Sequence, residues 1–256
     1  MLRIVPIPAF SDNYIWLILN ENTAAAVDPG DGLATHNYLK THNIKLSHIL
    51  ITHDHSDHTG GIDYLKNHYN VEVFGPKSSK LTNLNKRLCN GDQVIIFDTI
   101  FDVISAQGHT QEHIIYFHKN PKNPILFSGD VLFSAGCGRI FEGTPVQMFE
   151  SLSKIKSLPL NTLIYPAHEY SLSNLDFAAF VEPDNPIIND TKILYTQKRI
   201  QSIPTLPTTL SLELKINPFL RTDSTSIRET IKKSQSKSVK KEQDVFTILR
   251  HMKDKF

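Results

Sequence analysis

The chain has 256 residues, of which 40% are apolar and 21% are charged, so it is long and apolar enough to bury a substantial core. Its two cysteines, Cys89 and Cys137, are too few for a disulfide framework and favour a reducing compartment. No stretch approaches the roughly 20 apolar residues of a membrane span, and the first residues have no secretory pattern. We therefore expect a cytoplasmic protein with no membrane partner.

The net charge of +1 is distributed unevenly along the chain. Residues 1–191 hold 13 Lys/Arg and 20 Asp/Glu, whereas residues 192–256 hold 14 and 6. Such a basic C-terminal part could attract nucleic acid, a membrane surface or a small anionic substrate. Because no nucleic-acid motif or aromatic interleaving accompanies it, we expect no nucleic-acid partner and solvated helical surfaces for most of these lysines.

Hydrophobic periodicity predicts strands mixed with helices up to about residue 168. The predicted strands are 2–8, 14–19, 24–27, 47–51, 71–74, 93–97, 100–105, 113–118, 124–127 and 162–165. The predicted helices in this part are 33–43, 60–69 and 145–157. After it we expect helices alone, over 172–181, 185–202, 226–234 and 241–253, and a mobile loop over 234–241. This change of character predicts an α/β domain at 1–168 and a smaller helical domain at 169–256.

One stretch, residues 49–61, runs from an apolar strand into three histidines and two aspartates and then two glycines. His53 and His55 are two residues apart, so an extended backbone points both to the same side. Asp57 and His58 follow where a turn can redirect the chain. A polar turn before a helix would need one or two such residues, not five in six positions. Since imidazole and carboxylate suit zinc, iron or manganese, the stretch predicts a metal site.

Three later residues can complete this site: His109, Asp130 and His168. Each follows an apolar strand, and side chains at the ends of separate strands can converge. Taken singly, each is an ordinary loop or turn residue. The seven candidate ligands are His53, His55, Asp57, His58, His109, Asp130 and His168. Seven are too many for one tetrahedral metal and suit two, with Asp130 as the natural bridge and a water or hydroxide in the remaining shared position.

The motifs Thr-His-Asp-His-Ser-Asp-His (52–58), Gly-His-Thr (108–110), Ser-Gly-Asp (128–130) and Pro-Ala-His-Glu-Tyr (166–170) resemble the metallo-β-lactamase fold family. Within it, the chain is similar over nearly its whole length to glyoxalase II, the hydroxyacylglutathione hydrolase family. Further matching motifs are Asp12-Asn13-Tyr14, Cys137 to Thr144, Val181-Glu182-Pro183, Asn217 to Arg221 and Arg250 to Phe256. The resemblance implies an α/β fold, a metallo-β-lactamase-like αββα sandwich followed by a smaller C-terminal helical domain that binds substrate.

The same resemblance implies an assignment of the ligands. One metal would be bound by His53, His55 and His109, the other by Asp57, His58 and His168, and Asp130 would bridge them. We expect two divalent ions per chain, zinc first, with iron or manganese as alternatives. The implied glutathione pocket consists of Arg139, Ile140, Phe141, His168, Glu169, Tyr170, Arg250 and Lys253. Part of the family has tyrosine where this chain has Phe141, so one hydroxyl is absent.

The implied activity is hydrolysis of the thioester of S-(2-hydroxyacyl)glutathione, with S-D-lactoylglutathione giving glutathione and D-lactate in methylglyoxal degradation. A metal-bridging hydroxide would attack, so no protein nucleophile is needed. We interpret Cys137 as a small loop residue rather than a nucleophile. Asp54 either orients a histidine, which we favour, or assists proton transfer. We expect a monomer whose partner is a small-molecule thioester.

Three other functions compete with this one. Another metallohydrolase of the same fold could act on a lactam, a lactone or nucleic acid, but Arg250 and Lys253 argue against it. A mononuclear iron dioxygenase could act on glutathione persulfide, but Asp57, His58 and His168 together favour two metals. A non-enzymatic binding module is disfavoured because all seven ligands are present. The remaining histidines have no ligand context and are expected to be structural: His36, His42, His48, His68, His113, His118 and His251.

Overall fold

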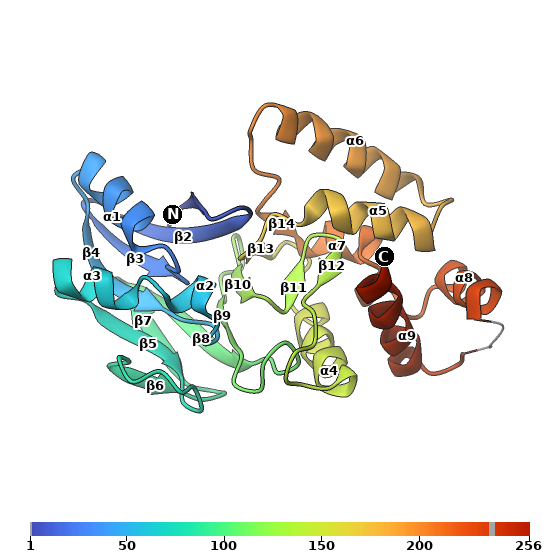
Figure 1. Ribbon diagram of the computed structural model, residues 1–256, viewed down its shortest axis with the longest axis horizontal. Helices are drawn as coiled ribbons and strands as arrows, with labels where there is room; N and C mark the ends of the chain where they lie inside the picture. Colours follow the sequence, from blue (N-terminus) through green and yellow to red (C-terminus); the bar gives the residue numbers. More distant parts are fainter. Residues whose placement is uncertain (1, 236–238) are drawn as a thin grey trace. The chain divides into compact units, whose positions relative to one another are not determined.

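The computed structural model describes residues 2–235 and 239–256 (Figure 1). Contacts within the chain divide it into two compact units. The first unit is Met1–Ser105 with Glu112–Gly129, and the second is Ala106–Gln111 with Asp130–Phe256. The predicted domain boundary at residue 168 is a division by function and stays a prediction. Of the mobile loop expected over 234–241, residues 236–238 lie outside the described residues.

The first unit contains a six-stranded sheet in the order β1-β2-β3-β4-β5-β6. Its strands are β1 (Arg3–Ala9), β2 (Asn13–Asn20), β3 (Thr23–Val27), β4 (Lys45–Leu50), β5 (Glu72–Pro76) and β6 (Lys86–Leu88). The first three pair antiparallel, and β3 to β6 pair in parallel. Its helices are α1 (Gly32–Thr41), α2 (Ser56–Thr59) and α3 (Ile62–His68). Because parallel neighbours end at the same edge, the turns after β3 and β4 lie together.

Strand β2 is buried on both faces, which explains its continuous apolar sequence. Ile15 and Leu17 pack on one face in a cluster with Leu39 of α1 and Leu65 of α3. Trp16 points to the opposite face and is equally buried. The two helices therefore cover one face of this sheet, while the other face carries a second apolar layer.

The first unit also contains an antiparallel set of strands in the order β10-β9-β8-β7. These strands are β7 (Gln93–Ile96), β8 (Thr99–Ser105), β9 (Ile114–His118) and β10 (Ile125–Gly129). Tyr116 of β9 donates its hydroxyl hydrogen to the Ile51 carbonyl at 2.8 Å, and the Ile114 N–H donates to the Thr52 carbonyl at 2.9 Å. These bonds attach the chain after β4 to β9, directly before the histidine-rich stretch.

The second unit is mainly helical and contains two short antiparallel strand pairs. Its strands are β11 (Leu132–Phe133), β12 (Gly136–Cys137), β13 (Leu163–Pro166) and β14 (Thr208–Thr209). Its helices are α4 (Pro145–Lys156), α5 (Ser171–Val181), α6 (Pro186–Ile200), α7 (Leu210–Ile216), the 3-10 helix η1 (Pro218–Leu220), α8 (Thr225–Gln235) and α9 (Glu242–Lys255). A capping box between Thr144 and Gln147 begins α4. Helix α9 packs through Phe246 against Phe219 and Phe149.

The predicted strands and long helices all correspond to observed ones, with ends shifted by a few residues. The expectation of helices alone after His168 is wrong in one respect, because Thr208 and Thr209 form β14 against β13. Two residues are too short for a periodic signal, and their pairing partners Ile164 and Leu163 lie more than 40 residues earlier. The short strands β6, β11 and β12 and the helices α7 and η1 were not predicted.

Candidate active site

His53 and His55 lie in the turn that follows β4. The distance between His53 Nε2 and His55 Nδ1 is 3.1 Å, and the two ring centroids are 4.7 Å apart. The His53 ring is also stacked on His113 at 4.7 Å. His113, which the sequence placed among structural residues, therefore supports a candidate ligand directly. The geometry brings these two predicted ligands together, as their spacing requires.

Asp28 organises the neighbouring backbone and two ligand rings. Its carboxylate accepts from the Thr52 N–H at 2.8 Å and from the Thr52 hydroxyl at 2.7 Å. Because that hydroxyl has donated its hydrogen, it accepts from His53 Nδ1 at 3.0 Å. Asp28 Oδ2 also lies 3.1 Å from His58 Nδ1. His53 therefore carries its hydrogen on Nδ1, and the carboxylate beside His58 Nδ1 favours the same tautomer there, which leaves Nε2 of each ring for a metal.

Asp57 and His58 form the second pair in this stretch. His58 Nε2 lies 3.4 Å from Asp57 Oδ2, and the Asn13 amide donates to the same oxygen at 3.0 Å. Gly30 packs so closely here that a Cβ would lie 1.7 Å from the Asp57 carbonyl. The turn at residues 28–32 therefore packs directly against the backbone of a candidate ligand. The sequence indicated only a turn there, although the parallel register of Val27 with Leu50 could have located Asp28 beside Thr52.

His109, Asp130 and His168 belong to the second unit. The Nε2 atoms of His109 and His168 lie 3.4 and 3.3 Å from Asp130 Oδ2. His109 Nδ1 lies 2.7 Å from the Arg139 carbonyl, which fixes the hydrogen on Nδ1 and leaves Nε2 for a metal. A Cβ on Gly138 would lie 1.9 Å from the Asp130 carbonyl. Only glycine lets the chain pass this closely behind the carboxylate.

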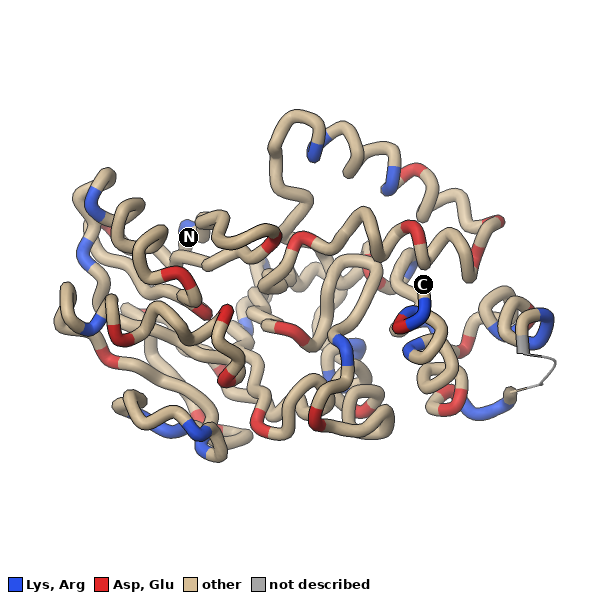
Figure 2. Tube along the Cα trace, viewed as in Figure 1, with Lys and Arg blue, Asp and Glu red and all other residues tan. Residues whose placement is uncertain are grey.

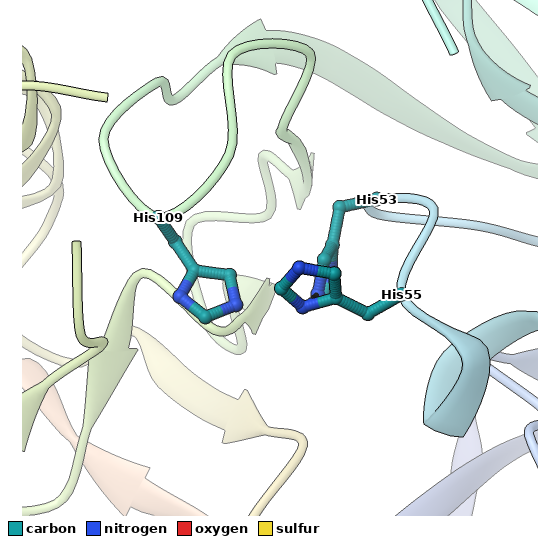
Figure 3. A group of neighbouring side chains, drawn as sticks. All are labelled: His53, His55 and His109. Atoms are coloured by element: carbon teal, nitrogen blue, oxygen red, sulfur yellow. Dashed lines mark hydrogen bonds between the residues drawn. The ribbon is translucent and has the colours of Figure 1, made fainter. Parts of the chain in front are cut away.

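Three groups of side chains offer ligand atoms that lie within 4.8 Å of one another. They are His53, His55 and His109 (Figure 3); His53, His58 and Asp130; and Asp57, His58 and His168. All five candidate imidazoles have a nitrogen within 3.4 Å of another candidate ligand, and three have Nδ1 beside an oxygen of a supporting residue. This donor set fits divalent ions, and its size indicates a binuclear divalent site.

Aromatic rings line the chain around His168. The Tyr170 ring is stacked on His168 at 4.7 Å with an interplanar angle of 4°, and Phe133 meets Tyr170 edge-on at 5.1 Å. The carboxylate of Glu169 accepts from the N–H and the hydroxyl of Thr205. The Tyr170 side chain is exposed, whereas the Glu169 carboxylate is held by Thr205.

The segment Arg139–Phe141 passes beside His109. The Phe141 ring meets the His109 ring edge-on at 5.3 Å and is 61% exposed. Ile140 is half-buried and Arg139 is exposed. The exposed Phe141 ring thus offers an apolar surface beside a candidate ligand.

Arg250 and Lys253 project from the last turns of α9. The Arg250 guanidinium donates to the Cys137 carbonyl at 2.9 Å and lies over the Phe219 ring at 5.2 Å. The Lys253 amine donates to the Ser173 carbonyl at 3.0 Å and lies near the Phe177 ring. Burial and the charge of Arg250 lower the pKa of Lys253.

Two residues outside the ligand set were given roles from the sequence. Cys137 is buried, and burial raises the pKa of its thiol although Arg250 opposes this. A thiol with a raised pKa is a poor nucleophile, as expected from the sequence, but Cys137 lies in strand β12 and not in a loop as predicted. The Asp54 carboxylate accepts from the Lys80 N–H at 3.3 Å, and its own N–H donates to Glu112. The role of Asp54 in orienting a histidine stays a prediction.

Comparison with known proteins agrees with this geometry. Residues 9–168 match the family model of the metallo-beta-lactamase superfamily, and residues 169–256 match that of the hydroxyacylglutathione hydrolase C-terminus. Hydroxyacylglutathione hydrolase of Vibrio parahaemolyticus is 48% identical, and that of Pseudomonas aeruginosa is 42% identical; each match covers 100% of both chains. The solved structure of ETHE1 from Myxococcus xanthus has a TM-score of 0.67 at 22% identity and covers 98% of this chain and 91% of that one, which shows the shared fold.

The match over residues 9–168 defines the class as a metallo-β-lactamase-type protein. The chain belongs to the metallo-β-lactamase superfamily and, within it, to the hydroxyacylglutathione hydrolase family. The predicted family and fold class, with a helical C-terminal part, are thereby confirmed. No helix in the described part of the chain is long and apolar enough to cross a membrane.

Proposed function

We propose that this chain hydrolyses the thioester of S-(2-hydroxyacyl)glutathione, with S-D-lactoylglutathione giving glutathione and D-lactate in methylglyoxal degradation. The observation that carries the proposal is the full-length similarity to hydroxyacylglutathione hydrolases, which spans both the candidate ligands and the basic end of α9. The cations Arg139, Arg250 and Lys253 are of the charge that the two carboxylates of glutathione require.

The proposed metal assignment follows the three groups of candidate ligands. His53, His55 and His109 would hold one ion, Asp57, His58 and His168 would hold the other, and Asp130 would serve both. Zinc is the proposed metal, and iron and manganese suit the same nitrogen and oxygen ligands. When bound, the ions supply an acidified water, since a metal can lower the pKa of water from about 15.7 to about 7, and they polarise the thioester carbonyl.

The chain's own residues orient the metal ligands and bind the substrate, and none of them needs to act as the nucleophile. Asp28, Thr52 and the Arg139 carbonyl hold the ligand histidines with Nε2 available. Arg250 and Lys253 receive the glutathione carboxylates. Tyr170 supplies a hydroxyl to the peptide part of the substrate, which compensates for the hydroxyl that Phe141 lacks. No side chain acts as nucleophile, because the Cys137 thiol has a raised pKa and is buried.

We also propose that two parts of the chain have different functions. Residues 1–168 form the metal-binding catalytic domain and residues 169–256 the substrate-binding domain. The meeting of the two family matches between His168 and Glu169 supports this division. We also propose a cytoplasmic monomer: both cysteines are free thiols, and all proposed ligands and pocket residues come from one chain.

The test is hydrolysis of S-D-lactoylglutathione by metal-replete protein, followed through loss of the thioester absorbance. We expect His58→Ala and Asp130→Ala each to lower kcat/KM by about 100-fold or more, since each removes a ligand that positions an ion. Asp223→Asn, a change in an exposed carboxylate 4.0 Å from Lys156, is the matched control and should leave kcat/KM unchanged. Activity that survives both ligand substitutions would refute the two-metal mechanism. Turnover of a β-lactam or of glutathione persulfide instead would favour a rival function.

A further inference from the structure

Three charged residues form an ion cluster beside the end of α9: Arg139, Arg250 and Asp254. Figure 2 shows blue and red segments beside the C-terminal label, where α9 ends. Asp254 Oδ1 accepts from Arg250 Nε at 3.2 Å and Nη2 at 3.0 Å, and lies 3.4 Å from Arg139 Nε. One carboxylate oxygen is therefore shared by two guanidinium groups that come from opposite ends of the second unit's sequence.

The side chains that make these contacts differ in how far they are exposed to water. The side chain of Arg250 is 7% exposed and that of Asp254 is 27% exposed, whereas Arg139 is 57% exposed. The Arg250 charge is thus largely removed from water, and a charge in that position needs a partner. The exposed Arg139 is held near a like charge only because Asp254 lies between the two. Without the carboxylate, repulsion between the cations would release Arg139 into solvent.

The cluster also holds the backbone beside a candidate metal ligand. Arg250 Nη1 donates to the Cys137 carbonyl at 2.9 Å, and the Arg139 carbonyl accepts from His109 Nδ1 at 2.7 Å. Gly138, between these two carbonyls, packs on the backbone of Asp130. Asp254 therefore braces both ends of the segment 137–139, through Arg250 at one end and the Arg139 side chain at the other.

We propose that Asp254 is a positioning residue for the glutathione carboxylate: it preorganises Arg139 and Arg250 as a pair of cations. This inference rests on the proposed function, since it concerns binding of the same substrate. A rigid pair of cations loses little conformational entropy when the substrate binds, so the effect falls on affinity more than on turnover. Asp254 acts through the two arginines and does not itself touch the substrate.

The test compares Asp254→Asn with Asp254→Glu and with the control Asp223→Asn. We expect Asp254→Asn to raise KM for S-D-lactoylglutathione about 5- to 30-fold, with kcat within about threefold and unchanged metal content. Asp254→Glu keeps the charge and should recover most of the affinity. In the double variant with Arg139→Gln, Asp254→Asn should add less to KM than it does alone, because both changes break the same pair.

An unchanged or lowered KM in Asp254→Asn overturns the inference, because a carboxylate that merely repelled the substrate would improve binding when removed. A fall in kcat and metal content at constant KM also overturns it, since that result would mean a role through His109 alone. Binding of S-methylglutathione, measured by calorimetry, separates this failure from failure of the proposed function. If the unmodified protein did not hydrolyse the thioester, Asp254→Asn should still weaken this binding, and equal affinity would contradict the inference.

Discussion

The carboxylate of Asp28 accepts two hydrogen bonds from Thr52 and lies 3.1 Å from His58 Nδ1, so it acts on two candidate metal ligands. It contacts the His58 ring directly and orients the His53 ring through the Thr52 hydroxyl. The ligands themselves could be predicted, because imidazoles and carboxylates are distinctive residue types at strand ends. Asp28 could not be recognised in the same way, because the sequence Asp-Pro-Gly around it has a sufficient explanation as a turn. Its left-handed backbone, with φ of 51°, is compatible both with a turn and with the hydrogen bonds that its side chain accepts from Thr52.

Lys253 provides a test of the substrate-binding cations through pH. Burial, first, and the charge of Arg250 lower its pKa below the ordinary value of 10.5. The cation is therefore lost at a lower pH than for an exposed lysine, and KM for the thioester should rise as pH increases through this pKa. Lys253→Arg retains its charge at these pH values, so its KM should stay flat to higher pH. A KM profile of Lys253→Arg that still rises where that of the unmodified protein does would show that another group titrates.

At the scale of elements, the hairpin β11–β12 owes its position to α7 and the residues around it. Glu213 accepts from the Ser134 hydroxyl, the Ala135 N–H and the Thr208 hydroxyl. Asn217 donates to the Phe133 and Gly136 carbonyls at 3.2 and 2.9 Å. These bonds stabilise Ala135 at φ of 55° and direct Phe133 toward His168 and Tyr170. Asn217 of the motif at 217–221 thus supports the hairpin whose Phe133 contacts His168 and Tyr170.

Glu213 also predicts how stability depends on pH. Burial raises its pKa above 4.5 in the folded chain, although several hydrogen bonds oppose this. Between these two pKa values the folded chain retains a proton that the unfolded chain has lost. The free energy of unfolding should therefore fall as pH rises from 4.5 through the raised pKa. Glu213→Gln cannot titrate, so denaturant unfolding at several pH values should show its stability gaining on that of the unmodified protein. Parallel stability curves would contradict a raised pKa.

The elements that could be predicted are those whose own sequence carries a pattern. Strand β2 is a continuous apolar run within 8 residues, and helix α9 has apolar residues at helical spacing over 14 residues. The hairpin β11–β12 and strand β14 consist of two-residue strands, which depend on partners far away in the chain. The glycines at 108 and 138 could be seen, but not the backbone groups against which they pack. Contacts of this kind are properties of the folded chain and leave no local pattern.

At the scale of the whole molecule, the candidate ligands come from four separate places in the chain, at residues 53–58, 109, 130 and 168. The residue types allowed a two-metal site to be predicted from the sequence, whereas the substrate was inferred from the resemblance and the basic C-terminal part. The sequence does not show which residues hold the candidate ligands in place. Thr52, the Arg139 carbonyl and Asn13 can be recognised in this role only from the folded chain.

The central claim is that a binuclear metal site in this chain hydrolyses a hydroxyacylglutathione. The most direct measurement is the rate of S-D-lactoylglutathione hydrolysis while zinc is added back to chelator-treated protein. We expect hydrolysis to be absent without metal and to rise until two ions are bound per chain, since the donor set has room for two. A plateau at one ion per chain, or no hydrolysis at two, would contradict the account.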